Sequence, residues 1–112
     1  MNKLCDLHTH SCFSDGTYTP EQLLQKADAL GLGAIALTDH NTVQGLPDFL
    51  EAAKSHQAEV VPGAEFSTDF EGKELHILGL FIQSVYFDEI TEKMVDMHRR
   101  KEESNRALVE KL

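Results

Sequence analysis

Residues 33–39, with the sequence Gly-Ala-Ile-Ala-Leu-Thr-Asp, constrain the fold more than any other stretch of the chain. They are apolar at consecutive positions, which is typical of a strand buried on both faces in a parallel sheet. Upstream, Thr19-Pro20-Glu21-Gln22 is typical of a helix start, because threonine caps, proline occupies the first helical position and glutamine closes a capping box. Gly31 supplies a helix end just before the strand. This order predicts a helix joined by a short turn to a buried strand.

The other elements continue this alternation. We expect a short buried strand over residues 3–8, the helix and strand described above, a helix over 46–57, strands over 59–67 and 74–82 joined through a tight turn at 71–73, and one long helix over 87–112. The order β-α-β-α-β-β-α predicts an α/β fold with a largely parallel sheet in a single domain. In such folds the functional residues lie at the carboxyl ends of the strands.

Composition narrows the classes of function. The chain has 112 residues and a net charge of −9, which argues against a broad electrostatic surface for nucleic acid. A small phosphorylated substrate stays possible, because bound divalent cations would reverse the sign of the charge locally. Cys5 and Cys12 form no framework pattern and are expected to be reduced thiols in a cytoplasmic protein. No apolar run approaches the ~18–20 residues of a membrane span, and the N-terminus resembles no secretion signal.

Residues 6–16 contain the clearest chemical motif. His8 and His10 are two positions apart in a predicted strand and therefore share a face with Asp6. Asp15 follows on a loop that contains Gly16. Two converging imidazoles followed by a carboxylate predict a metal site; the alternatives are histidines satisfied by backbone partners and an aspartate that only forms a turn.

Two further strands end in residues of the same kind. Asp39 and His40 follow the second strand, where the alternative is a strand-end cap, and Glu65 follows Pro62 and Gly63 on the third. An unpaired carboxylate in apolar surroundings is costly, so Glu65 is expected to have a metal or cationic partner. Ligand-type residues from three strands at one edge favour a shared site, and histidine with carboxylate suits zinc, manganese or iron.

The remaining candidates are less determined. His76 lies in an apolar strand, and the pattern alone leaves open whether it is a core residue or a ligand. His56 and His98 lie in polar helical surroundings and are expected at the surface. Asp6 and Asp39 are candidates for carboxylates that orient the imidazoles of metal ligands.

Four motifs in sequence order resemble the PHP (polymerase and histidinol phosphatase) superfamily of metal-dependent phosphoesterases. They are Asp6-Leu7-His8-Thr9-His10-Ser11 with Ser14-Asp15-Gly16, Thr38-Asp39-His40-Asn41 with Gly45, Pro62-Gly63-Ala64-Glu65-Phe66-Ser67, and His76-Ile77-Leu78-Gly79. The resemblance extends over residues 1–82. Residues 87–112, with Arg99, Arg100 and Arg106, look like a basic helix that precedes an inserted small domain in one branch of the family.

The resemblance implies a distorted (β/α)₇ TIM-like barrel, of which residues 1–112 would form an N-terminal, partial PHP domain. It also implies up to three divalent metal ions, Mn, Zn or Fe. The implied ligand sets are His8, His10 and Glu65 for one ion, Glu65 and His76 for a second, and Asp15 and His40 for a third. Family members take further ligands, a histidine and an Asp-x-His motif, from later strands that this chain does not contain.

The resemblance therefore implies a phosphoric ester hydrolase whose metal-activated hydroxide attacks phosphate esters of small molecules, nucleotides or short oligonucleotides. The active site of the 112-residue chain would be incomplete. The alternative is a non-catalytic PHP-like module that binds metal or a partner chain. An exposed edge on the fourth strand and an interrupted apolar stripe in the last helix also favour a dimer or a swapped assembly.

Overall fold

Helix α1 (Pro20–Leu30) begins and ends where its sequence signals predict in the computed structural model, which describes residues 3–110. Thr19 Oγ1 accepts a hydrogen bond from the Gln22 backbone N–H at 3.2 Å, while Gln22 Oε1 accepts one from the Thr19 N–H at 3.0 Å. Gly31 ends the helix with φ of 70°, a conformation that glycine adopts without a steric penalty. The capping box therefore determines where α1 starts.

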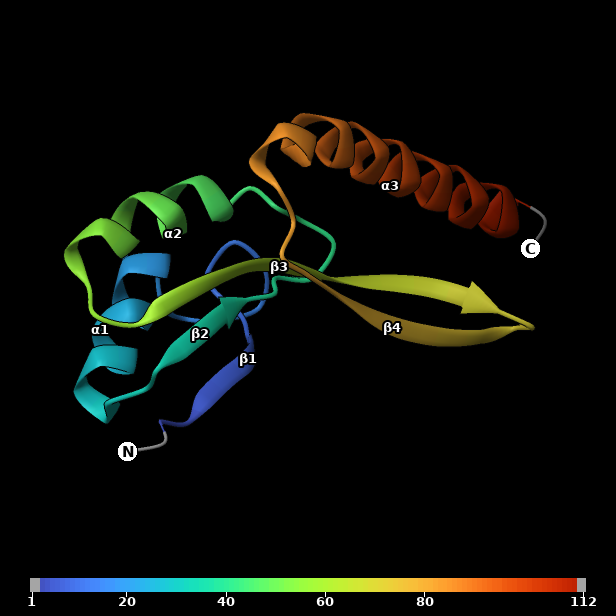
Figure 1. Ribbon diagram of the computed structural model, residues 1–112. Helices are drawn as coiled ribbons and strands as arrows, with labels where there is room; N and C mark the ends of the chain where they lie inside the picture. Colours follow the sequence, from blue (N-terminus) through green and yellow to red (C-terminus); the bar gives the residue numbers. More distant parts are fainter. Residues whose placement is uncertain (1–2, 111–112) are drawn as a thin grey trace.

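Four strands form a mixed sheet in the order β1-β2-β3-β4, as Figure 1 shows. The strands are β1 (Cys5–Thr9), β2 (Ala34–Leu37), β3 (Glu59–Phe70) and β4 (Lys73–Leu80). The pairings β1–β2 and β2–β3 are parallel, and β3–β4 is an antiparallel hairpin. Glu71 and Gly72 form its two-residue turn, both with positive φ, as the turn of a tight hairpin requires. The predicted α/β fold is confirmed, with the strands arranged as an open half-barrel.

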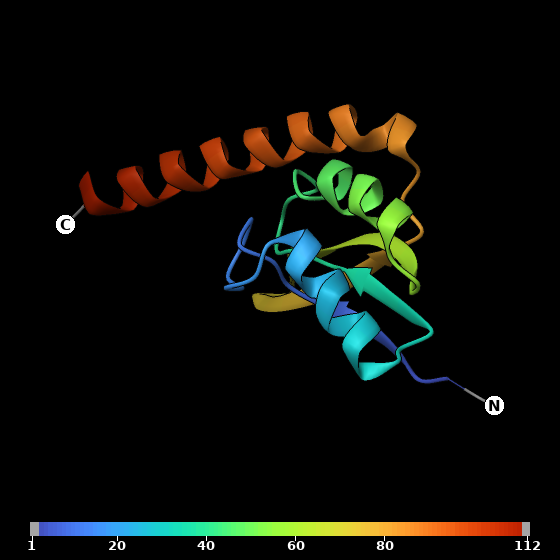
Figure 2. The same cartoon turned by 90° about the vertical axis from the view of Figure 1, so that its left-hand side faces the viewer.

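The core lies between one face of this sheet and helices α1 and α2 (Leu46–Ala52), which cover it side by side (Figure 2). Its largest fully buried side chains include Leu24 from α1, Leu37 from β2 and Phe49 from α2. Truncating one of them to alanine would cost about 2–5 kcal/mol of stability. Residues 35–37 are all buried, which confirms that β2 is covered on both faces.

The prediction of a buried first strand is wrong. Residues 5–8 of β1 are exposed, because β1 lies at one edge of the sheet and pairs only with β2. β4 lies at the opposite edge of the sheet, and its residues 73–78 are exposed. This agrees with the exposed edge that was expected on the fourth strand. The sheet therefore presents two unpaired edges within residues 3–110.

The helix predicted over 46–57 is shorter than expected, whereas the last helix begins at Phe87 as predicted. α2 ends at Ala52 and continues as the 3₁₀ turn η1 (Ala53–Ser55), instead of extending to residue 57. After the 3₁₀ turn η2 (Ser84–Tyr86), helix α3 (Phe87–Glu110) packs its first turn against the core and then runs alongside the β3–β4 hairpin (Figure 1). Residues 111–112 of the predicted helix lie outside the described residues.

Cys5 and Cys12 are exposed free thiols. No helix within residues 3–110 has both the length and the apolarity that crossing a membrane requires.

His56 is not the surface residue that its polar neighbours suggested, since its side chain is only 10% exposed. Its Nδ1 lies 2.7 Å from Asp28 Oδ2, and its Nε2 lies 3.2 Å from Glu21 Oε1. Asp28 Oδ1 also accepts hydrogen bonds from the backbone N–H groups of Gln57 and Ala58. These contacts hold His56 in an extended conformation. Because an extended residue cannot belong to a helix, α2 ends before the predicted residue 57.

The same contacts change two pKa values. Hydrogen bonds to Asp28 and Glu21 raise the pKa of His56, although burial opposes the change. The hydrogen bond from His56 lowers the pKa of Asp28; burial opposes this change, and the backbone N–H groups reinforce it. The contribution of His56 to stability is complete below the pKa of about 6.5 that it has in the unfolded chain. It is lost as pH rises through the higher pKa of the folded protein. The contribution of Asp28 is complete above the pKa of about 3.9 that it has in the unfolded chain. It is lost as pH falls through the lower pKa of the folded protein.

We therefore predict that His56→Gln destabilises the fold most between about pH 4 and 6.5, where both partners are charged. Urea unfolding measured across this range and up to pH 9 should show the cost shrinking at higher pH. His98→Gln, which changes an exposed histidine on α3, is the matched control and should show no such dependence. A cost for His56→Gln that does not vary with pH would contradict the assignment.

Candidate metal centre

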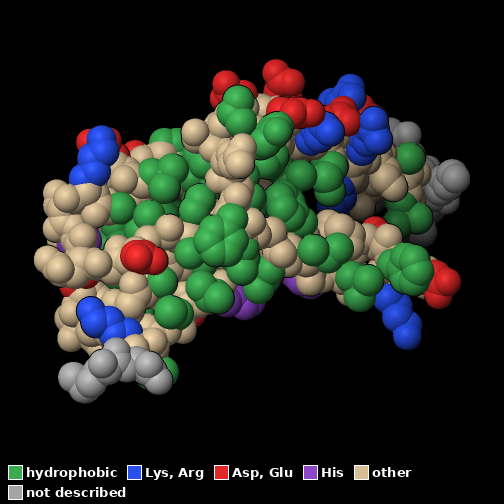
Figure 3. Space-filling model, in the orientation of Figure 1, with side chains coloured by type: hydrophobic (Ala, Val, Ile, Leu, Met, Phe, Trp, Pro, Cys, Tyr) green, Lys and Arg blue, Asp and Glu red, His purple; other side chains and the backbone are tan. Residues whose placement is uncertain are grey.

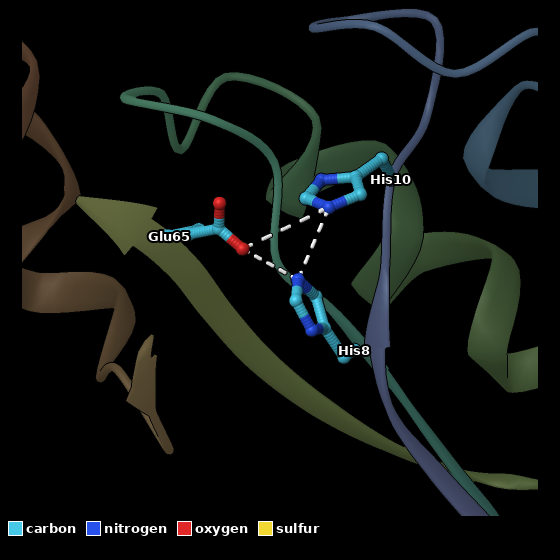
Figure 4. Close-up of side chains that lie close together, drawn as sticks. All are labelled: His8, His10 and Glu65. Carbon is cyan, nitrogen blue, oxygen red and sulfur yellow. Dashed lines mark hydrogen bonds and ion pairs between the residues drawn. The ribbon is translucent and has the colours of Figure 1, made fainter. Parts of the chain in front are cut away.

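His8 and His10 converge on Glu65 from the end of β1, as Figure 4 shows. Their Nε2 atoms are 3.2 Å apart, and the rings meet edge to face with centroids 5.0 Å apart. His8 Nε2 donates to Glu65 Oε1, and His10 Nε2 lies 3.9 Å from the same oxygen. The two histidines of the first motif and the carboxylate of the third therefore form one group of donor atoms.

A second group joins His10, Asp15 and His40. The rings of His10 and His40 are stacked, with centroids 4.3 Å apart and planes inclined by 5°. Asp15 Oδ2 lies 3.1 Å from His40 Nε2, and Asp15 Oδ1 lies 3.9 Å from His10 Nδ1. His10 Nδ1 is buried and has no hydrogen-bond partner among the described residues. A buried nitrogen that faces a carboxylate without a bond to it is a site where a cation could bind.

A third group joins His40, Glu65 and His76. Nδ1 of His40 and Nδ1 of His76 each lie 2.9 Å from Glu65 Oε2. The His76 side chain is 47% exposed on β4, so His76 is not the core residue that its apolar neighbours allowed. The structure therefore shows that the His76 side chain lies at the surface of β4 and not in the core.

Glu65 belongs to two of these groups and is only 5% exposed. Burial alone would raise the pKa of Glu65, but the hydrogen bonds from His76 and His8 and the nearby charge of His40 outweigh burial and lower it. The side chain is therefore an ionised carboxylate at neutral pH. Sequence reasoning placed Glu65 at a strand end, whereas β3 continues to Phe70. The residue lies inside β3, where it pairs with β4 on one side and is bridged to His40, beyond the end of β2, on the other.

The donor atoms fit divalent cations. Within each of the three groups they lie within 4.8 Å of one another. Two nitrogens that bind one tetrahedral ion at ~2.1 Å would lie roughly 3.4 Å apart, close to the 3.2 Å between the Nε2 atoms of His8 and His10. Neutral imidazoles combined with carboxylates suit zinc, manganese or iron.

The groups contain every ligand that the resemblance assigned to residues of this chain, and two of the groups are larger than the implied sets. His10 joins Asp15 and His40, and His40 joins Glu65 and His76. A neutral imidazole has one nitrogen with a free lone pair and one that carries a proton. His40, which lies 3.1 Å from Asp15 and 2.9 Å from Glu65, can therefore act as a ligand in one group and as a hydrogen-bond donor in the other.

Asp39 does not orient an imidazole, contrary to the sequence-based hypothesis. It is 2% exposed, and its Oδ1 accepts hydrogen bonds from the Ser11 N–H at 2.6 Å and the Ser14 Oγ at 2.8 Å, while its Oδ2 accepts one from Ser11 Oγ at 2.6 Å. These contacts anchor the loop that carries His10 and Asp15. Asp6 likewise contacts backbone, since its Oδ1 accepts a hydrogen bond from the His8 N–H at 3.2 Å.

Sequence reasoning missed the roles of Ser11 and Ser14 in this anchor. Their position beside His10 within one short motif was the available signal. Glycine is required next to the anchor, because a Cβ atom at Gly45 would lie 2.9 Å from the Phe13 ring and 3.2 Å from Asp39 Oδ2. The loop therefore depends on close packing as well as on hydrogen bonds.

Comparisons with known proteins agree with this geometry. The family model described as PHP domain matches residues 6–110. The 5'-3' exoribonuclease Rnm of Salmonella typhimurium is 35% identical over 109 residues, which is 96% of this chain and 37% of that protein. The phosphoribosyl 1,2-cyclic phosphate 1,2-diphosphodiesterase of Eggerthella lenta is 44% identical over 80 residues, covering 70% of this chain and 30% of that protein.

A solved structure supports the fold as well. The crystal structure of a candidate metal-dependent phosphoesterase from Bifidobacterium adolescentis superimposes with a TM-score of 0.67 at 35% identity, covering 70% of this chain and 27% of that one. The chain thus spans about a third of the length of the curated relatives it matches.

We predict that Glu65→Gln weakens binding of Mn²⁺ by more than the roughly 10- to 100-fold that loss of an outer partner of a ligand costs. The substitution keeps the size of the side chain and removes the charge that serves two groups of donors. Metal content after dialysis, by elemental analysis, and titration calorimetry measure the effect. His98→Gln removes an exposed imidazole on α3 and should bind as the wild type does. Equal affinity in Glu65→Gln and the wild type would exclude Glu65 from the centre.

Proposed function

The chain belongs to the PHP-domain family, and we propose that it carries the metal-binding part of a phosphoric ester hydrolase. The observation that carries this proposal is the overlap of the three donor groups, in which His10, His40 and Glu65 each belong to two. Overlapping groups suit several cations held side by side, an arrangement that can clamp a phosphoryl group. Manganese, zinc and iron are the proposed metals.

Phosphate esters of small molecules, nucleotides or short oligonucleotides are the proposed substrates. The two curated relatives described above are named for action on RNA and on a cyclic phosphate, both of which are phosphate diesters. The net charge of −9 would repel such anions unless cations in the site reversed the local sign. A substrate anion would therefore bind at the metal centre.

Cations bound at the centre would supply positive charge to the phosphoryl oxygens and lower the pKa of water to produce a nucleophile. The residues of the chain hold the geometry. Glu65 directs Oε1 toward His8 and His10 and Oε2 toward His40 and His76, so one rigid carboxylate sets the spacing between two groups. Asp15 is largely exposed at the outer side of the site, where substrate could approach.

We also propose a division of the chain and a location. Residues 1–82 carry the motifs of the site, and residues 87–112 form the second part, whose helix α3 (Phe87–Glu110) contributes no donor to the three groups among its described residues. The exposed free thiols of Cys5 and Cys12 suit a reducing compartment such as the cytoplasm.

The activity test compares the 112-residue chain with a chimera in which it replaces the matching part of the Salmonella typhimurium relative. With Mn²⁺ present, we expect the chimera to release phosphate from a nucleoside 3′,5′-bisphosphate and from p-nitrophenyl phosphate. Asp15→Ala, His40→Ala and Glu65→Ala should each abolish release. The chain alone should be slower by ~10²-fold or more, because misplacement of a reacting group by ~1 Å already costs that much.

Two outcomes would contradict this reading. Full activity in the 112-residue chain would show that donors from outside it are dispensable. An inactive chimera that is loaded with metal and folded, as judged by circular dichroism, would favour a non-catalytic module that binds metal or a partner chain.

We further propose that the chain associates with itself. Apolar side chains gather across the middle of the face shown in Figure 3. The exposed large apolar residues of the chain include Ile77 on β4, Phe81 after it, and Val85 and Tyr86 in η2. Patches of this kind beside an unpaired strand edge are uncommon on monomers. Light scattering at concentrations on the order of 10 µM should show a dimer, and Ile77→Lys should shift it toward monomer. A wild-type chain that stays monomeric would exclude the proposal.

A further inference from the structure

Asn41 directly follows His40 and has a φ of 51°, which is uncommon outside glycine. Its backbone N–H donates to the carbonyl oxygen of Glu65 at 2.9 Å, and the Glu65 N–H donates to the carbonyl oxygen of Asp39 at 3.0 Å. These two bonds form a parallel bridge between His40 and Glu65 beyond the end of β2. The bridge places two residues of the metal centre side by side.

The side chain of Asn41 extends this ladder by one further step. If the strand continued, the next bond of the parallel ladder would run from the Ser67 N–H to the backbone carbonyl of Asn41. The left-handed conformation turns the chain away, and the Ser67 N–H donates instead to Asn41 Oδ1 at 2.9 Å. Asn41 Nδ2 completes the pair by donating to Ser67 Oγ at 3.3 Å. A side-chain amide thus replaces the peptide group that the turn removes.

Ser67 is connected to the rest of the third donor group. It lies two residues after Glu65 on β3, so both side chains have the same orientation relative to the sheet. It also pairs directly with His76 across the β3–β4 hairpin. The Asn41–Ser67 pair therefore joins the residue after His40 to the hairpin that carries both Glu65 and His76.

We propose that Asn41 is a positioning residue of the metal centre, which ties His40 to Glu65 and His76 through its amide. This inference rests on the proposed metal centre. Asparagine meets two requirements at once, since it tolerates the left-handed conformation and carries an acceptor for the Ser67 N–H. Glycine meets only the first requirement, and aspartate keeps the conformation and the acceptor but loses the donor.

The test compares Asn41→Gly with Asn41→Asp, using hydrogen exchange of the Ser67 amide and the affinity for Co²⁺ measured by absorption titration. In Asn41→Gly we expect Ser67 to exchange faster and Co²⁺ affinity to fall by at least about tenfold, the lower bound for loss of an outer partner. Asn41→Asp keeps the acceptor for the Ser67 N–H and should retain protection and at least about a third of the affinity. Ser67→Ala removes only the weaker bond and should behave as the wild type does.

Asp28→Asn is the control for general loss of stability, because Asp28 anchors a loop away from the three donor groups. It should lower the urea midpoint without lowering Co²⁺ affinity. Equal losses of affinity in Asp28→Asn and Asn41→Gly would assign the effect to stability and overturn the positioning role. Unchanged affinity in Asn41→Gly would also overturn that role while leaving the metal centre intact. A wild-type protein that binds no Co²⁺ would overturn the centre and this proposal together.

Discussion

The buried carboxylate of Glu65 is the interaction on which the rest of the site depends. It is 5% exposed yet ionised, which is tolerated because its two oxygens have separate partners, His8 and His10 on one side and His40 and His76 on the other. Leaving such a charge without partners would cost about 3–5 kcal/mol. Its surroundings therefore cannot be rearranged without loss of stability, and this rigidity suits the proposed metal centre.

The sheet and its loops supply those partners in different ways. Parallel pairing delivers the ends of β1 and β2 to one side of β3, while the antiparallel hairpin brings β4 from the other side. Outside the strands, position depends on hydrogen bonds from side chains. Asp39 holds the loop of His10 through three hydrogen bonds, which come from the Ser11 N–H, the Ser11 hydroxyl and the Ser14 hydroxyl. Asn41 does the equivalent for His40.

Short sequence signals correctly predicted those elements whose position and burial depend on neighbouring residues in the chain. The capping box at Thr19 placed the start of α1 correctly, and the consecutive apolar residues of β2 predicted burial on both faces. Predictions failed where distant residues decide the outcome. The apolar start of β1 suggested burial, but its place at the edge of the sheet exposes it. The end of α2 depends on the contact between His56 and Asp28, which lie 28 positions apart in the chain.

The sequence alone determined which residues could form the centre, because imidazoles and carboxylates at strand ends in a βαβ pattern have few other uses. The residue pattern by itself left His76 open, since an apolar strand suits a core residue and a ligand equally well, and only the family resemblance assigned it. Tertiary structure excludes the core position, because the pairing of β4 with β3 leaves His76 47% exposed and places its Nδ1 2.9 Å from Glu65 Oε2. It also decided that Asp39 binds serines instead of imidazoles, because loop conformation depends on packing that no short motif encodes.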